Sequence, residues 1–181
     1  MTDEQLVEGC KLQNPSHQRK LYEKFSRKMF GVCLRYANSR EEAEDLLQDS
    51  FVKVFQHVSS FKMEGSLEGW VRRIVVNTSL EFIRKQKLQW VNIEDADEPA
   101  ESEVVLDHMN AKELLMIINK LPTGFKAVFN LYAIEGYNHR EIGDLLGITE
   151  STSKSQYSRA KAALVKSIQE IESATKDIVK E

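Results

Sequence analysis

The sequence predicts an all-α protein made of two small helical domains that are joined by a flexible linker. Its 181 residues include only 8 glycines and 3 prolines, so few positions interrupt a helix. Apolar residues recur every three or four positions before residue 88 and after residue 109, which is the helical period. Between these zones, residues 92–107 carry seven acids, one proline and no base, a composition typical of unpacked chain. We therefore expect domains at 1–91 and 109–181, with a linker at 92–108.

The overall composition excludes several classes of protein. A net charge of −3 argues against a protein that coats nucleic acid over its whole surface, although charge can still be segregated locally. No apolar run approaches the roughly 20 residues that a membrane helix needs, and the acidic N-terminus leads into no signal core. We therefore expect a cytoplasmic protein without direct membrane insertion. The two cysteines, Cys10 and Cys33, match no metal-ligand spacing, and no cofactor is expected.

In the first domain we expect helices over residues 16–38, 40–58 and 66–88. The second of these has an acidic outer face, because residues 40–56 hold five acids and two bases. An acidic face is repelled by phosphates but can dock on a basic partner helix; an ordinary solvated face is the other reading. The candidate residues on this face are Glu42, Asp45, Gln48, Asp49, Val52 and Gln56.

The third helix is basic, since residues 62–88 hold six bases and three acids. Its expected core arc comprises Leu67, Trp70, Val71, Ile74, Val75, Thr78 and Phe82. Basic side chains beside an asparagine suit phosphate and base contacts, and two apolar residues of the preceding loop could support an extruded base. The candidate DNA-binding residues are Phe61, Lys62 and Met63 of the loop and Arg73, Asn77, Arg84 and Lys85 of the helix. A solvated basic face would explain this helix about as well if it stood alone.

The second domain carries a helix-turn-helix pattern. Helices are expected over 110–120, from there to Gly136, and over 150–168. Asn138 and Glu141 form a capping-box pattern, Gly147 suits the turn, and Thr149 can cap the last helix. Small polar and basic side chains near the start of that helix suit the major groove, although two helices packed without nucleic acid would share the pattern. The outward candidates are Ser151, Thr152, Lys154, Ser155, Gln156 and Arg159.

Three segments in this order resemble the extracytoplasmic-function (ECF) branch of the sigma-70 family, over nearly the whole chain. Residues 45–52 (DLLQDSFV) look like the family's polymerase-binding motif. Residues 69–77 (GWVRRIVVN) are similar to the start of its minus-10 recognition helix, and residues 152–161 (TSKSQYSRAK) to its minus-35 recognition helix. Three motifs in the family's order, with an acidic linker between them, are more specific than any one alone.

The resemblance implies an alternative sigma factor that binds core RNA polymerase and directs initiation through minus-10 and minus-35 promoter DNA. The acidic face would bind the clamp coiled coil, the second domain would lie at the flap, and the linker would thread toward the RNA exit path. The loop at 61–65 would capture a flipped base, with Asn77 and its basic neighbours on the strand. An anti-sigma factor, membrane-anchored in some cases, is a typical partner. The family often has Arg where Gln156 and Lys161 stand here; because Gln suits adenine and Arg suits guanine, the minus-35 preference is expected to differ.

Two other classes of function were weighed. A helix-turn-helix regulator that is not a polymerase subunit would explain the second domain, but it leaves the acidic and basic helices of the first domain without a role. An enzyme is disfavoured, because the four histidines lie far apart in the sequence and no nucleophile triad or glycine-rich phosphate loop is present. We therefore expect a non-enzymatic DNA-binding protein.

Overall fold

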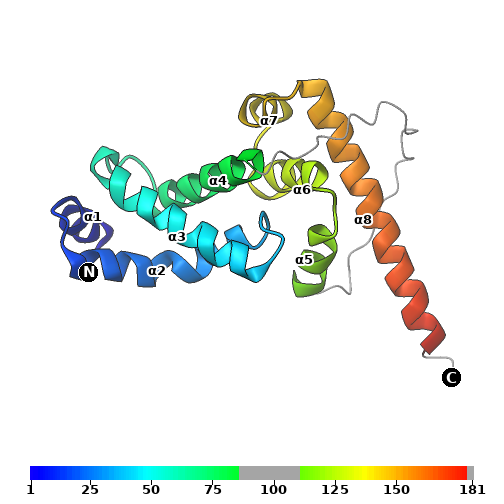
Figure 1. The fold of residues 1–181 in the computed structure, drawn as a ribbon, viewed down its shortest axis with the longest axis horizontal. Coiled ribbons are helices and arrows are strands. Elements are labelled where there is room, and N and C mark those ends of the chain that lie inside the picture. The colour runs from blue at the N-terminus through cyan, green and yellow to red at the C-terminus, as the bar shows by residue number, and fades with distance from the viewer. Residues whose placement is uncertain (86–110, 179–181) are drawn as a thin grey trace. The chain divides into compact units, whose positions relative to one another are not determined.

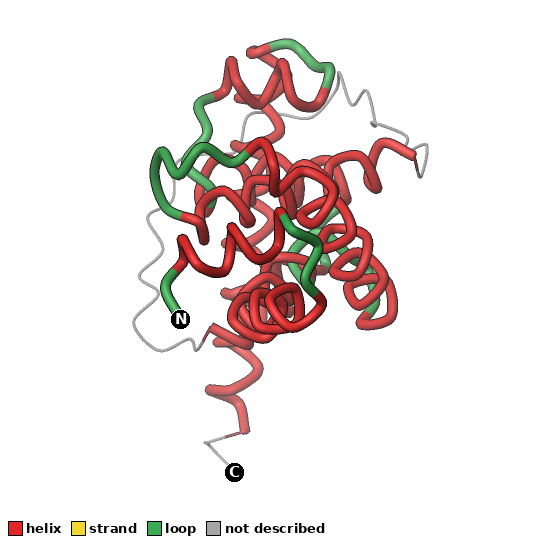
Figure 2. The backbone as a smooth tube through the Cα atoms, turned by 90° about the vertical axis from the view of Figure 1, so that its left-hand side faces the viewer, coloured by secondary structure: helices red, strands yellow, loops and turns green. Residues whose placement is uncertain are grey.

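The computed structural model describes residues 1–85 and 111–178, which fall into two compact units divided between Gln86 and Lys87. Each unit is described by itself. Helices are the only regular elements among the described residues (Figures 1 and 2). The expected linker at 92–108, both of its boundaries and the expected helix end at Leu88 lie outside the described residues.

The N-terminal unit is built from four α-helices. They are α1 (Asp3–Lys11), α2 (Pro15–Cys33), α3 (Arg40–His57) and α4 (Leu67–Lys85), with a 3-10 turn, η1 (Val58–Ser60), after α3. Helices α2, α3 and α4 pack against one another in all three pairs, and α1 packs on α2 (Figure 1). Their shared core includes the fully buried side chains Leu21, Met29, Val54, Val71 and Leu80. The outer faces of α3 and α4 are thereby held on one rigid support.

Side chains cap the starts of these helices. The Asn14 Oδ1 atom accepts from the Ser16 backbone N–H at 3.0 Å, and Ser39 Oγ accepts from the Glu42 N–H at 3.1 Å. Ser66 Oγ accepts from the Gly69 N–H at 3.3 Å at the start of α4. Helix α2, however, ends at Cys33 rather than near residue 38, because the chain tightens into a turn there and buries Tyr36.

The buried arc of α4 differs in part from the expected one. Trp70, Ile74 and Phe82 are only half-buried. The core instead takes in four side chains that the sequence pattern did not assign to it: Val76, Ser79, Leu80 and Ile83. Helix α4 is therefore buried over a wider arc than one amphipathic stripe, because it packs on α2 and α3 at once.

The C-terminal unit contains α5 (Ala111–Asn119), α6 (Thr123–Phe129), α7 (His139–Leu146) and α8 (Glu150–Ile178), with a π-helical turn, η2 (Asn130–Ile134), after α6. Ile117, Ile118 and Leu121 pack on Ala160, Leu164 and Ile168 of α8 in one apolar cluster. Helix α8 continues to Ile178, beyond the expected end at 168, because no glycine or proline interrupts it. Its N-terminal half carries the helix-turn-helix contact with α7.

Candidate functional sites

The acidic face of α3, defined as Glu42, Asp45, Gln48, Asp49, Val52 and Gln56, lies on the outside of the N-terminal unit. All of its residues are exposed except Glu42, which is half-buried. Val52 is 54% exposed, more than Tyr22 of α2 at 38%. Asp45 and Asp49 form no ion pair with any described residue. An exposed apolar side chain next to uncompensated carboxylates has the composition of a protein-binding surface.

Glu42 also has a structural role. Its Oε2 atom accepts a hydrogen bond of 2.8 Å from the Asn38 backbone N–H, and its own N–H donates to Ser39 Oγ. These two bonds hold the start of α3, with the carboxylate reaching Asn38, the residue before the N-cap Ser39. The sequence placed Glu42 on the acidic face, and the structure adds that its carboxylate also holds the end of the helix.

The basic face of α4, defined as Arg73, Asn77, Arg84 and Lys85, is exposed throughout. Of the two acids in α4, Glu81 lies within one turn of this face, and it accepts a hydrogen bond of 2.6 Å from Lys53 of α3. That bond is the main cause that lowers the pKa of Glu81. The carboxylate therefore remains ionised and is neutralised by Lys53, so it subtracts little from the positive potential of the basic face.

The loop before α4 is arranged differently from the prediction. Phe61 is only 5% exposed, and its ring packs against Trp70 with centroids 5.1 Å apart. The expectation that Phe61 offers its ring to an extruded base is therefore corrected: it anchors the loop in the core. Lys62 and Met63 remain exposed, and Met63 adopts a left-handed backbone conformation with φ of 61°. Gly65 follows with φ of 92°. The buried Phe61 ring anchors the loop, and the left-handed conformations of Met63 and Gly65 turn the chain. Lys62 and Met63 are thereby exposed to solvent.

The helix-turn-helix is built as its sequence predicted. Asn138 Oδ1 accepts from the Glu141 N–H at 2.9 Å, and Glu141 Oε2 accepts from the Asn138 N–H at 2.8 Å, which completes the capping box. Gly147 ends α7 with φ of 71°, a left-handed conformation that favours glycine. Thr149 Oγ1 accepts from the Thr152 N–H at 3.0 Å at the start of α8.

Two further supports of this motif were missed by the sequence analysis. A Cβ atom on Gly143 would lie 2.8 Å from the carbonyl oxygen of Ile148, so only glycine fits where α7 meets the turn. His139 Nδ1 lies 3.0 Å from Oγ of the buried Ser153, and the His139 ring stacks on Tyr132 with centroids 4.3 Å apart. His139 thus ties α7 to α8 and to η2. The local sequence held a signal for Gly143, a glycine inside a helix, but none for the His139–Ser153 pair.

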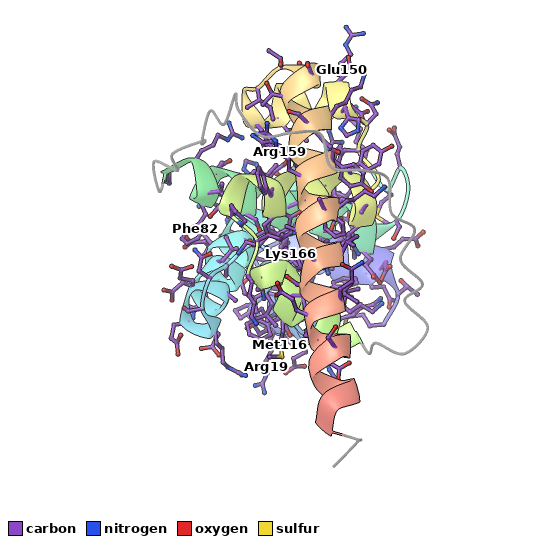
Figure 3. The ribbon with its side chains drawn as sticks, turned by 90° about the vertical axis from the view of Figure 1, so that its right-hand side faces the viewer. Arg19, Phe82, Met116, Glu150, Arg159 and Lys166 are labelled. Atoms are coloured by element: carbon purple, nitrogen blue, oxygen red, sulfur yellow. The ribbon has the colours of Figure 1, made fainter. Side chains whose placement is uncertain are left out.

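The outward residues of α8 lie near its N-terminal end. Ser151, Lys154 and Ser155 are exposed, and Thr152 and Arg159 are half-buried. Figure 3 shows Glu150 at the start of α8 and Arg159 further along the same helix. Lys154 pairs with Glu150 at 2.6 Å, and this bond is the main cause that lowers the pKa of Glu150. Glu150 therefore neutralises part of the positive charge at the N-terminal end of α8.

Gln156 does not lie where base reading requires. It is 6% exposed, and its side-chain oxygen is buried without a hydrogen-bond partner. The expectation that Gln156 contacts a base is corrected, because the neighbouring helices cover this side of α8.

Within residues 1–85 and 111–178, no group of three His, Cys, Asp or Glu side chains is placed to hold a metal ion. No described helix is long and apolar enough to span a membrane.

Comparison with known families matches both units. The family model described as Sigma-70 region 2 matches residues 21–89, and the model described as Sigma-70, region 4 matches residues 111–164. The chain therefore belongs to the sigma-70 family. It is an alternative sigma factor, a class that directs transcription initiation at promoters, and a regulator unrelated to the polymerase is not favoured.

The similar curated proteins include ECF sigma factors of several bacteria. The ECF RNA polymerase sigma-E factor of Haemophilus influenzae is 27% identical, with 93% of this chain and 96% of that protein aligned. SigW of Bacillus subtilis is 26% identical, with 80% and 84% aligned. SigE of Mycolicibacterium smegmatis is 28% identical, but the aligned part covers 76% of this chain and only 56% of that protein.

Two solved structures share the fold. The sigma factor RpoE of Bartonella quintana, solved with the anti-sigma factor NepR, aligns with a TM-score of 0.53 at 20% identity over 83% of this chain and 96% of that one. CnrH, solved with the cytosolic domain of CnrY, aligns with a TM-score of 0.50 at 19% identity over 92% and 97%.

Proposed function

We propose that the acidic face of α3 is the surface through which this sigma factor binds core RNA polymerase, at the clamp coiled coil. The observation that carries the proposal is the exposed Val52 beside Asp49, with Asp45 one turn before Asp49 on the same face. Neither carboxylate forms an ion pair with a described residue. A basic partner helix would supply both the missing charges and an apolar contact for Val52.

We assign promoter DNA to two surfaces: the basic face of α4 and the exposed N-terminal residues of α8. The basic face of α4, with Lys62 and Met63 of the loop, suits a separated minus-10 strand, because Arg and Lys contact phosphates and Asn can read a base edge. The exposed N-terminal residues of α8 suit the major groove of the minus-35 duplex. The proposed minus-35 contacts are Ser151, Thr152, Lys154, Ser155 and Arg159. Gln156 is not among them.

Partners and location follow from the same proposal. The B. quintana neighbour was solved with an anti-sigma factor, and we infer that an anti-sigma factor also regulates this chain. Contact of the second unit with the polymerase flap is part of the proposal. The chain acts where polymerase and DNA are, in the cytoplasm, and it contributes recognition rather than catalysis.

The experiment that tests the assignment is the affinity of Asp49→Ala for core polymerase. Removing one member of a charged contact that is buried on binding typically costs about 2–5 kcal/mol. Glu44→Ala is the matched control: it removes the same charge from the same helix, but Glu44 pairs with Arg40 at 2.8 Å and lies off the acidic face. We expect Asp49→Ala to weaken binding with unchanged helix content. Equal affinities for the two variants, or unfolding of Asp49→Ala, would refute the role.

A further inference from the structure

The outer side of α2 is the most basic helical surface of the N-terminal unit, and none of the assigned functions uses it. The helix carries five cations, Arg19, Lys20, Lys24, Arg27 and Lys28, and a single acid, Glu23. Lys20, Lys24, Arg27 and Gly31 follow one another at spacings of four, three and four residues, opposite the buried Leu21, Phe25 and Met29. These four residues, with Lys28 on their flank, are called the basic stripe of α2.

The stripe is only partly neutralised. Lys24 pairs with Asp3 of α1, and Lys28 pairs with Glu68 of α4 at 2.8 Å. Lys20 and Arg27 are exposed and form no ion pair with any residue in the described part of the chain. Like charges three and four residues apart on a helix repel one another, so an anion along the stripe would relieve this repulsion.

Gly31 adds an independent observation. It lies inside the helix, where glycine is less stable than alanine, yet a Cβ atom there would meet no atom within 4 Å. The packing of the unit therefore does not require glycine at this position. A bare backbone beside Arg27 leaves room for a ligand to approach the helix closely, and Arg35 donates from Nη1 to the Gly31 carbonyl at 3.4 Å beside it.

The stripe and the basic face of α4 lie on two helices of the same unit. Helices α2 and α4 pack directly on each other, and the Lys28–Glu68 pair joins the stripe to the first turn of α4. Glu68 lies on the side of α4 turned away from Arg73 and Asn77, so the stripe and the basic face are separate surfaces of the same unit. No large apolar side chain is exposed within the stripe, whereas the acidic face of α3 has Val52. A surface of cations without an apolar anchor is typical of phosphate binding rather than of protein docking.

We propose that the basic stripe of α2 is a second, sequence-independent phosphate-binding surface for promoter DNA, in addition to the basic face of α4. The proposal rests on the DNA-binding role proposed for α4. Because it involves only the backbone, it adds affinity and salt dependence but no base preference.

The test uses holoenzyme reconstituted from core polymerase and the full chain, and measures its affinity for fork-junction promoter DNA over a salt series. In the variant Lys20→Ala/Arg27→Ala we expect weaker binding at low salt. The slope of log K against log salt should fall in magnitude by about 0.7–0.9 for each lost phosphate contact. The matched control is Lys11→Ala/Arg19→Ala, which removes two cations from the same unit off the stripe; both residues are paired, and Arg19 projects outward in Figure 3. The control should keep the wild-type slope.

Gly31→Gln supplies a second variant that we expect to keep the fold, because glutamine favours the helix and a Cβ atom there meets no atom within 4 Å. We expect a raised Tm together with weaker DNA binding. The proposal is overturned if Lys20→Ala/Arg27→Ala keeps the wild-type salt slope of DNA binding. It is also overturned if this variant loses as much affinity for core polymerase as for DNA, because the stripe would then be a polymerase contact. Arg73→Ala/Asn77→Ala tests the role of α4 separately: if it also leaves DNA binding unchanged, the proposed function of α4 fails as well.

Discussion

At the scale of single residues, His139 links the stability of the C-terminal unit to pH. Its ring is held between Tyr132 and Ser153, and burial, followed by the charge of Lys154, lowers its pKa below the usual 6.5, while Glu150 opposes this. The unfolded chain therefore takes up a proton at a higher pH than the folded chain. As pH falls through about 6.5, the free energy of unfolding should fall, and the loss should level off below the folded pKa.

The measurement compares wild type with His139→Gln, which keeps a group able to hydrogen-bond Ser153 but cannot titrate. The stability advantage of wild type should be larger at about pH 7.5 than at about pH 5.5. An NMR titration of the His139 ring gives the folded pKa directly. A stability difference that does not change between these two pH values would contradict the prediction.

Gln156 is a buried polar residue whose replacement should stabilise the protein. Its Oε1 atom has no hydrogen-bond partner, and an unsatisfied buried group typically costs about 1–3 kcal/mol. Methionine has a similar length and no such atom, so Gln156→Met should raise the free energy of unfolding of the C-terminal unit by about 1 kcal/mol. The selected minus-35 sequences should stay as in wild type. A changed base preference would show that Gln156 turns outward when DNA is bound.

At the scale of elements, the contact between α7 and α8 depends on Gly143. Alanine there would bring its Cβ to 2.8 Å from the Ile148 backbone oxygen, which no flexible side chain can relieve. We expect Gly143→Ala to lower the free energy of unfolding by about 1–3 kcal/mol, as other overpacked sites do, and to weaken minus-35 binding. Gly69→Ala is the control, since its Cβ would meet only the Ser66 Cβ at 3.8 Å. Equal stability of the two variants in thermal unfolding would refute the steric argument.

The elements also differ in how far the sequence predicted them. The starts of α3, α7 and α8 were expected correctly, because Ser39, Asn138 and Thr149 hydrogen-bond within three residues of themselves. The ends of α2 and α8 were wrong. No local signal marks the turn after Cys33, where burial of Tyr36 governs the path of the chain. The extension of α8 to Ile178 agrees with the lack of glycine and proline after residue 168, a local signal that the prediction did not use.

At the scale of the whole molecule, the chain should behave as two independently folded units. The described residues divide between Gln86 and Lys87, and each unit has its own apolar core. The prediction from composition is that limited proteolysis cuts within residues 92–107 and releases two helical fragments, because seven acids and a proline oppose packing. Circular dichroism of the separated fragments would check their folding. Complete protection of residues 92–107 in the free protein would contradict it.

The sequence by itself determined what depends on near neighbours along the chain. Helical periodicity, the caps, the turn at Gly147 and the opposite charges of α3 and α4 all involve residues a few positions apart. These features were enough to predict an all-α protein of two parts and its resemblance to sigma factors. They also placed Asp45, Asp49, Arg73 and Asn77 on exposed faces, because solvent exposure of a helix follows from its period.

Only the tertiary structure decided which side chains at the edge of a face turn inward. Phe61 meets Trp70, Gln156 is covered by the helices around α8, and Gly143 touches the backbone of Ile148. His139 reaches Ser153 fourteen positions away. These outcomes depend on how helices pack against one another, and a packing contact between distant segments leaves no periodic signal in either segment alone.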